Sequence, residues 1–215
     1  MIKPEVVVID YGVGNLLSVQ RGLEHCGAKV TLTAEPGKIL AAKRVVLPGV
    51  GAFGNAMEAL HNLDLVEVIR ELANKKIALL GICLGMQLLL EESEEFGLTA
   101  GLGLIPGRVL PIPKRTELGE IQKIPHIGWS SLQLSDGLNG WNGTLLQHNH
   151  PGESAYFVHS FMAVPTDPNH RIADCEYGGR SIAAVIRREH ITGCQFHPEK
   201  SGDVGLKMLR RFCLD

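Results

Sequence analysis

The chain has 215 residues, of which 45% are hydrophobic, and this length is enough to bury the core of one large domain. The net charge is −2, and positive and negative residues are interspersed along the chain. This balance excludes both the basic surface that nucleic acid needs and a charged interaction tail. We therefore expect a single domain over residues 1–215 without a nucleic-acid partner.

Hydropathy and cysteine content indicate the cellular setting. No apolar stretch approaches the roughly 18 residues that a membrane span requires. The apolar run Val6 to Ile9 is also too short for the central region of a signal peptide. The five cysteines are odd in number and lack the Cys-x-x-Cys spacing of zinc sites and disulfide frameworks. These features predict a cytoplasmic protein with reduced thiols, no bound metal, no cofactor and no membrane contact.

Short apolar runs alternate with helical patterns through the first half of the chain. Strands are expected at Val6–Ile9, Lys29–Thr33, Val45–Leu47 and Ile77–Ile82, and helices at Leu16–His25, Ile39–Ala42, Ala52–Leu60 and Leu63–Asn74. This alternation predicts an α/β fold whose parallel sheet is covered by helices on both faces.

Functional sites in such sheets lie beyond the carboxyl ends of the strands. Three segments follow predicted strands, namely Asp10-Tyr11-Gly12, Pro48-Gly49-Val50-Gly51 and Cys83. Although they are far apart along the chain, we expect them to meet at one edge of the sheet.

The second half changes character, since prolines, glycines and polar residues crowd its long loops. Short β-like runs follow at Ala155–Val158, Ile182–Ile186 and Ile191–Phe196, and Asp203–Cys213 has a helical pattern. We interpret the runs as antiparallel or mixed additions to the sheet, and the last segment as a C-terminal helix.

A Gly-x-Cys-x-Gly motif stands at the end of the strand Ile77–Ile82. It runs from Gly81 to Gly85 and precedes a helix-like segment, Met86–Glu92. Flanking glycines permit a tight strand-turn-helix elbow that lifts the Cys83 thiol clear of the backbone. The start of the helix favours the thiolate. A cysteine after an apolar run is more often a buried small residue, so the motif alone leaves both interpretations open.

A second motif, Gln195-Phe196-His197-Pro198-Glu199, supplies what a nucleophilic cysteine requires. A base must take the thiol proton, and a further group must orient that base. His197 and Glu199 have the right chemistry, although a lone His-x-Glu is usually a surface pair. The joint occurrence of both motifs favours a catalytic set of Cys83, His197 and Glu199.

Several motifs together resemble the glutaminase subunits of imidazole glycerol phosphate synthases, which are class-I, triad-type glutamine amidotransferases. The motifs are Asp10 to Asn15, Leu47 to Gly54, Gly81 to Leu89, Ile124 to Trp129, Tyr156 to Ser160 and Gln195 to Gly202. The resemblance extends from about residue 5 to the C-terminus. It implies a single-domain, three-layer, flavodoxin-like fold with a central, mostly parallel sheet and antiparallel additions.

The resemblance implies a catalytic role for each matching position. Cys83 attacks the carboxamide of glutamine, forming a thioester and releasing ammonia, and water then frees glutamate. His197 acts as base toward the thiol and as acid toward the departing ammonia, while Glu199 orients the imidazole. The backbone N–H groups of Val50 and Leu84 are the expected donors to the oxyanion.

The resemblance also implies how glutamine is held. Gln87 lies one helical turn beyond the nucleophile, so its side chain can face the pocket and bind the α-amino-acid end of the substrate. Glu95 is expected to help, although it lies in an acidic run that could equally be a solvated surface. Gly51 and the backbones of Ser160 and Phe161 complete the expected contacts. A tyrosine is usual where this chain has Phe161.

A partner that accepts ammonia is expected, because free ammonia is mostly ammonium at neutral pH and would be lost to solvent. The resemblance implies that this partner is a (β/α)8-barrel synthase subunit. The resemblance implies Trp129, Tyr156 and Lys200 as interface positions, although Trp129 by itself would be placed in the core. His126 lies in the segment that the family uses as its partner-facing surface. His159 lies in a predicted strand and is interpreted as structural rather than as a competing base.

The predicted function is hydrolysis of L-glutamine and delivery of ammonia to the barrel subunit. That subunit makes imidazole glycerol phosphate and aminoimidazole carboxamide ribonucleotide in histidine biosynthesis. A paralogous glutaminase subunit that feeds another synthase, for example one that aminates a surface-polysaccharide sugar, remains an alternative. So do a thiol hydrolase that acts alone on γ-glutamyl bonds and a non-catalytic binding protein of the same fold. The lack of a further substrate domain and the intact catalytic set argue against these last two.

Overall fold

The computed structural model describes residues 3–214, so the ends of the predicted domain (residues 1, 2 and 215) lie outside the described part. Five parallel strands form its centre, in the order β2 (Lys29–Thr33), β1 (Glu5–Ile9), β3 (Arg44–Gly49), β4 (Ala78–Cys83) and β14 (Ile191–Cys194). This is the strand order of a flavodoxin-like sheet. The predicted α/β class and the predicted parallel sheet are confirmed.

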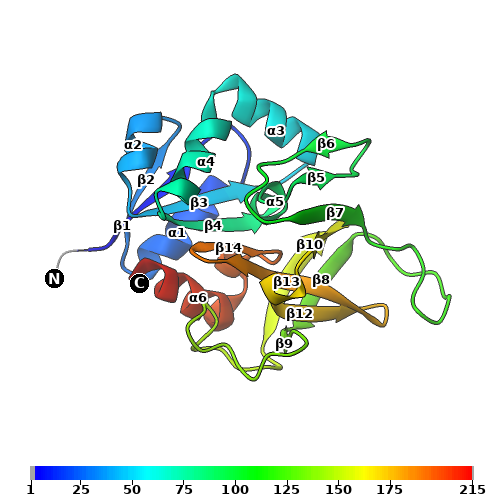
Figure 1. Ribbon diagram of the computed structural model, residues 1–215. Coiled ribbons are helices and arrows are strands. Elements are labelled where there is room, and N and C mark those ends of the chain that lie inside the picture. Colours follow the sequence, from blue (N-terminus) through cyan, green and yellow to red (C-terminus); the bar gives the residue numbers. More distant parts are fainter. Residues whose placement is uncertain (1–2, 215) are drawn as a thin grey trace.

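Helices cover both faces of the parallel strands, as Figure 1 shows. On one face lie α2 (Pro36–Ala41), α3 (Phe53–Asn62) and α4 (Leu65–Asn74), and on the other α1 (Leu16–His25) and α6 (Gly202–Leu214). The side chains of β1 alternate between the two cores. Val7 and Ile9 join the apolar cluster under α2, α3 and α4, and Val6 and Val8 join the one under α1 and α6. An uninterrupted apolar run therefore fills two cores at once, as a buried parallel strand must.

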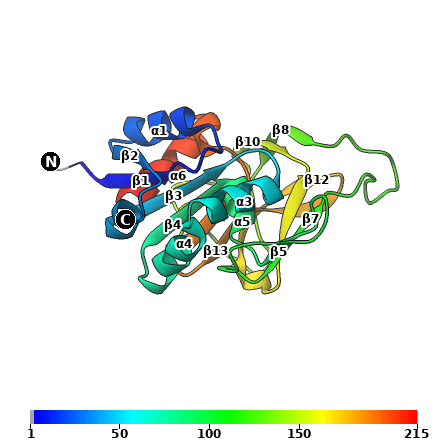
Figure 2. The same cartoon turned by 90° about the horizontal axis from the view of Figure 1, so that it is seen from above.

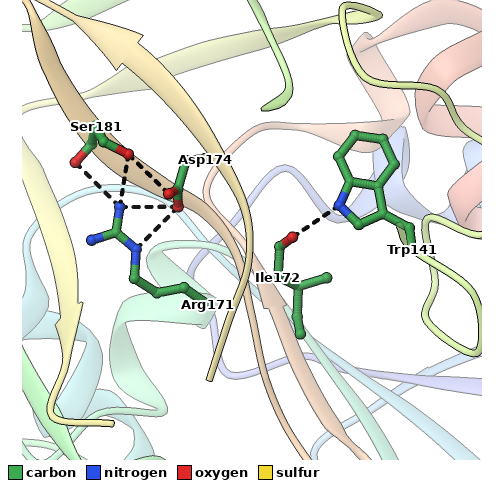
Figure 3. Close-up of polar contacts among 5 residues, drawn as sticks. All are labelled: Trp141, Arg171, Ile172, Asp174 and Ser181. Carbon is green, nitrogen blue, oxygen red and sulfur yellow. Dashed lines mark hydrogen bonds and ion pairs between the residues drawn. The ribbon is translucent and has the colours of Figure 1, made fainter. Parts of the chain in front are cut away.

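Three antiparallel strands extend the sheet beyond β14, namely β13 (Arg180–Arg188), β12 (Arg171–Tyr177) and β9 (Gln133–Leu134). The register between β12 and β13 shifts between Arg171 and Asp174, and polar contacts hold this irregularity (Figure 3). The Arg171 guanidinium donates to Asp174 Oδ1 at 3.1 Å and to Ser181 Oγ at 3.1 Å, and Ser181 Oγ donates to Asp174 Oδ2 at 2.8 Å. Buried Trp141 donates from Nε1 to the Ile172 carbonyl at 2.8 Å, which ties the long loop after β9 to the sheet.

Two smaller sheets stand on the side of the molecule opposite the termini (Figures 1 and 2). One pairs β10 (Ser154–His159) with β8 (His126–Ser131), and the other has the order β11 (Phe161–Pro165), β7 (Gly107–Pro111), β5 (Glu92–Ser93) and β6 (Thr99–Ala100). Two short 3-10 turns, η1 (Pro168–His170) and η2 (Pro198–Lys200), complete the elements. Within the described residues, no helix combines the length and apolarity needed to cross a membrane.

One predicted helix is wrong. The helix after the cysteine is α5 (Leu84–Leu88), which ends well before Glu92, and Glu92 already belongs to β5. Leu88, Leu89 and Leu90 are all fully buried, whereas a surface helix would expose part of such a run. The carbonyl groups of these leucines accept hydrogen bonds from residues 102–105 instead of from a further helical turn. Burial on all sides therefore ends the helix early.

The glycines of the elbow let α5 lie directly against the sheet. A Cβ atom on Gly85 would overlap the carbonyl oxygen of Leu47 in β3, and one on Gly81 would lie 2.6 Å from the carbonyl oxygen of Gly85. Neither position has room for any other residue. The predicted close-packed turn is thus confirmed, and its neighbour is β3.

We predict that Gly85→Ala lowers the free energy of unfolding by about 1–3 kcal/mol, because the new methyl group forces α5 away from β3. Gly37→Ala is the matched control, since a Cβ there meets nothing within 4 Å. It should be neutral or stabilising by up to about 1 kcal/mol. Guanidinium denaturation measures both variants, and equal effects would contradict the close approach of α5 and β3.

Candidate active site

Cys83 is the last residue of β4 and begins the turn into α5. Its φ of 56° and ψ of −110° form a conformation that side chains rarely adopt. Strain of this kind is typical of a nucleophile at an elbow. Because α5 has only five residues, its dipole contributes less to the thiol than the sequence suggests.

His197 and Glu199 follow β14, which lies beside β4 in the sheet. His197 Nδ1 lies 2.8 Å from Glu199 Oε1, and the imidazole is also hydrogen-bonded to the Cys83 side chain. With Nδ1 paired to the carboxylate, Nε2 is the nitrogen that faces the sulfur. The side chains of His197 and Glu199 are 4% and 0% exposed. The structure thus brings the three residues of the predicted catalytic set together.

The surroundings of His197 favour its charged form. Burial opposes a charge on the ring, but hydrogen bonds with the Cys83 and Glu199 side chains, and the negative charges of both, outweigh burial and raise the pKa of His197 to about 9. The imidazole is therefore charged at neutral pH. Such an imidazolium stabilises a neighbouring thiolate and can protonate a leaving group.

A cavity of about 270 Å³ opens in front of Cys83. The predicted site residues that line it are Val50, Gly51, Cys83, Leu84, Gln87, Glu95, Ser160, Phe161 and His197. They come from five separate segments of the chain, namely residues 50–51, 83–87, 95, 160–161 and 197. Pro125, Val158 and His159 complete the lining.

Gln87 is buried and tightly held. Its Nε2 atom donates to the Phe161 carbonyl at 3.1 Å and to Gln195 Oε1 at 3.0 Å. Gln195 is fully buried, and its own Nε2 lies 3.9 Å from Cys83 Sγ. The sequence motif by itself gives Gln195 no role, although its place two residues before His197 at the same strand end is a usable signal.

Glu95 lies in the cavity wall rather than on a fully solvated surface. Its Oε2 atom accepts a hydrogen bond of 2.6 Å from the backbone N–H of Phe53, the first residue of α3. A carboxylate at this end of a helix is favourable because the first N–H groups have no partner within the helix. The Oε2 atom of Glu95 thus binds the start of α3, while the other carboxylate oxygen remains available to a ligand.

The expected oxyanion donors lie on either side of the nucleophile. Gly49 is the direct neighbour of Cys83 in the register of β3 and β4, so Val50 follows at the level of the sulfur. Tyr11, from the segment after β1, is buried and donates from its hydroxyl to the Pro48 carbonyl at 2.8 Å. The three segments that follow predicted strands meet at one edge, as expected.

His159 and His126 do not compete for the role of base. Both are buried, which lowers the pKa of each to about 4, and His126 Nδ1 lies 3.0 Å from His159 Nε2. His159 Nδ1 contacts the Phe161 carbonyl at 2.8 Å. The structural interpretation of His159 agrees with these contacts. His126, in contrast to the expected surface position, points inward.

Trp129 is 58% exposed, so its placement in the core from its residue type alone is wrong. It lies on β8 opposite Tyr156 of β10, with ring centroids 5.9 Å apart. The alternating strand turns His126 inward and Trp129 outward. Lys200 is exposed in η2, and η2 lies against β10 because His197 N donates to the Tyr156 carbonyl at 3.0 Å.

Among residues 3–214, no group of three or more His, Cys, Asp or Glu side chains is placed to hold a metal ion. The five cysteines are free and buried.

We predict that the charge on His197 governs how Cys83 reacts with charged reagents. The ratio of the alkylation rates by iodoacetate and by iodoacetamide should fall as pH rises through about 9, because only the anion is attracted by the imidazolium. Rapid quench with mass spectrometry of the Cys83 peptide measures both rates. Glu199→Gln should move the midpoint of this fall to lower pH. A ratio that stays constant from pH 7 to 10 would contradict the raised pKa.

Comparison with known proteins agrees with this geometry. The family of glutamine amidotransferases of class I matches residues 7–215. The imidazole glycerol phosphate synthase subunit HisH 1 of Legionella pneumophila (strain Lens) is 49% identical over 207 residues, which cover 96% of this chain and 97% of the relative. The HisH subunit of Methanosarcina acetivorans is 46% identical over 208 residues, covering 96% of each chain.

Two solved structures share the fold. A chain in the structure of PurLQS from Thermotoga maritima has a TM-score of 0.70 and 18% identity, with 98% of both chains covered. A crystal structure of a glutamine amidotransferase has a TM-score of 0.69 and 16% identity, with 94% of both chains covered. Since the family match spans nearly the whole sequence and the relatives are similar along their full length, this chain belongs to the class-I glutamine amidotransferase family.

Proposed function

We propose that this chain is the glutaminase subunit of an imidazole glycerol phosphate synthase and works in histidine biosynthesis. The observation that carries the proposal is the buried contact of Cys83, His197 and Glu199 at a cavity of metabolite size, in a chain 44–49% identical to HisH subunits. These relatives give no support to the alternative of a subunit that serves sugar amination. The proposed unit is one domain over residues 1–215, and free thiols support a cytoplasmic location.

The proposed chemistry begins with the thiolate of Cys83 attacking the carboxamide carbon of glutamine. The His197 imidazolium then gives its Nε2 proton to the amide nitrogen, which leaves as ammonia, and a thioester remains. A water molecule, deprotonated by the now neutral imidazole, attacks the thioester and frees glutamate. Glu199 holds Nδ1–H throughout and keeps the ring aligned.

The proposed oxyanion donors are the N–H groups of Val50 and Leu84. Both residues line the cavity next to Cys83, one after β3 and the other at the start of α5. Loss of one such donor typically costs about 10²–10³-fold in rate. Gln87 and Glu95, with Gly51 and the backbones of Ser160 and Phe161, are proposed to hold the α-amino-acid end of glutamine.

The proposed partner is a (β/α)8-barrel synthase subunit that consumes the ammonia. The surface proposed to bind it consists of the exposed Trp129, the half-buried Tyr156 beside it, and the exposed Lys200 on the neighbouring turn. An aromatic pair of this kind supplies large contact area at low entropic cost, which suits the centre of an interface. HisH relatives carry the name of a synthase subunit, which supports a multisubunit assembly.

We predict that Cys83→Ala abolishes glutamine-dependent synthase activity of the complex, by at least about 10³-fold. The same complex should keep its activity when ammonium salt replaces glutamine, because the barrel's own chemistry does not use the thiol. Wild-type glutamine hydrolysis should be slow for the isolated chain and rise when barrel and acceptor ligand are present. Glutamate release and product absorbance measure the two reactions. A variant that lost both activities would point to a misfolded complex, and one that kept both would refute the proposed nucleophile.

We predict that Trp129→Ala weakens binding to the barrel subunit about 30-fold or more, as expected for a central aromatic anchor. Leu214→Ala is the control, since Leu214 is 67% exposed and ends α6 on the opposite side of the molecule (Figure 1). Isothermal titration calorimetry measures both affinities. Equal affinities for the two variants would exclude the surface around Trp129 as the interface.

A further inference from the structure

Two buried histidines at the glutamine pocket take no part in the proposed chemistry, since His159 lines the cavity wall and His126 lies behind it. His126 of β8 and His159 of β10 are neighbours in the strand register, and they are 2% and 6% exposed. His126 Nε2 lies 2.9 Å from Ser130 Oγ, and His126 Nδ1 lies 3.0 Å from His159 Nε2. His159 Nδ1 lies 2.8 Å from the Phe161 carbonyl. The contacts form one chain from Ser130 to Phe161.

The direction of the hydrogen bonds in this chain of contacts follows from its last member, the Phe161 carbonyl. A carbonyl oxygen can only accept, so His159 must carry its hydrogen on Nδ1. In a neutral ring Nε2 then accepts, so the hydrogen of His126 must also be on Nδ1. His126 Nε2 in turn accepts from the hydroxyl of Ser130. Every hydrogen bond in the chain therefore points toward Phe161.

Both rings are held in the state and orientation that this direction requires. Burial lowers the pKa of His126 and of His159 to about 4, so the rings are neutral at physiological pH. The His126 ring is stacked between Phe157 and Tyr177, with centroid distances of 5.1 Å and 4.1 Å. Stacking against both rings fixes the plane of the His126 ring, and the hydrogen bonds fix the positions of its two nitrogens within that plane.

The Phe161 carbonyl at the end of the chain belongs to an edge strand. β11 is the outermost strand of its sheet, and the register partner of Phe161 is Pro111, which has no N–H to donate. The carbonyl is bonded instead by two side chains, His159 Nδ1 and Gln87 Nε2 at 3.1 Å. It thus connects the histidine pair to the wall of the pocket.

The amide of Gln87 is oriented by this carbonyl and by Gln195. Both hydrogens of Nε2 are used, one toward Phe161 O and one toward Gln195 Oε1. The remaining amide atom, Oε1, can only accept a hydrogen bond. An acceptor fixed in this way suits the ammonium group on the α-carbon of an amino acid.

We propose that His159, oriented by His126, is a positioning residue that fixes the Phe161 carbonyl and with it the Gln87 amide, so that Gln87 Oε1 faces the α-ammonium group of glutamine. The inference rests on the proposed glutaminase function and deepens it. His159 is not a base in the reaction. It decides which atom of Gln87 meets the substrate.

Two substitutions of His159 separate this role from a structural one. In His159→Asn, the Nδ2 atom occupies the place of Nδ1 and can still donate to the Phe161 carbonyl. In His159→Gln, the terminal amide occupies the place of Nε2, so the contact with His126 survives and the one with Phe161 is lost. Both side chains are uncharged, and both variants keep one of the two contacts.

For the barrel complex, His159→Gln should raise KM for glutamine about tenfold, as expected for the loss of one hydrogen bond, with a smaller effect on kcat. His159→Asn should raise KM less than threefold, even if both variants lose similar thermal stability. Steady-state kinetics and thermal melts measure these effects. Equal KM values, or a larger increase for His159→Asn, would overturn the proposal.

Nitrogen-15 spectra of the histidines test the direction of the chain without any substrate. At pH 7 the rings of His126 and His159, assigned by loss of signal in variants, should both be neutral with the hydrogen on Nδ1. A neutral histidine side chain that is exposed to water prefers the other tautomer. We call the hydrogen bonds from Ser130 through His126 and His159 to Phe161 the histidine relay. Signals of the other tautomer in an active wild-type complex would overturn this relay and leave the proposed function standing. A wild-type complex that releases no glutamate from glutamine overturns the proposed function, and with it the binding role of Gln87.

Discussion

The parallel register of β3, β4 and β14 is the constraint on which the site depends. Gly49 lies beside Cys83, and Cys194 lies beside Ile82, so the three strands end at one level. Whatever follows each strand must then share the same small space. That is why the proposed oxyanion loop after β3, the thiol of Cys83 and the imidazole of His197 meet although they are far apart along the chain. Position 85 has no room for a side chain in this arrangement, because α5 touches the backbone of β3 there.

Electrostatics divides the buried histidines into two kinds. Burial opposes a charge on His197, but its hydrogen bonds and electrostatic attraction to Cys83 and Glu199 outweigh burial, so its pKa rises to about 9. His126 and His159 have no such partners among their hydrogen bonds, and burial lowers the pKa of each to about 4. The same type of side chain is therefore charged at neutral pH in one place and neutral in the other. Neighbouring charge, and not burial alone, decides which.

The β8–β10 pair serves two surfaces at once because its side chains alternate. One face of the pair carries the exposed ring of Trp129, and the other carries His126 and His159 against the pocket wall. Ser130, next to Trp129, is the first member of the proposed histidine relay. The surface proposed for the synthase partner and the proposed orientation of Gln87 therefore share two adjacent strands.

Sequence alone determined the local features of this protein. Apolar runs such as Val6–Ile9 fixed the parallel strands, and the glycines around Cys83 fixed the elbow, since both depend on neighbouring residues in the chain. Only the tertiary structure decided where α5 ends, because the burial of Leu88 to Leu90 comes from distant segments. It alone turned Trp129 outward and brought Gln195 to Gln87, through strand pairings that no local pattern encodes. Local sterics and periodicity act within a few residues, whereas contacts across the sheet depend on the whole fold.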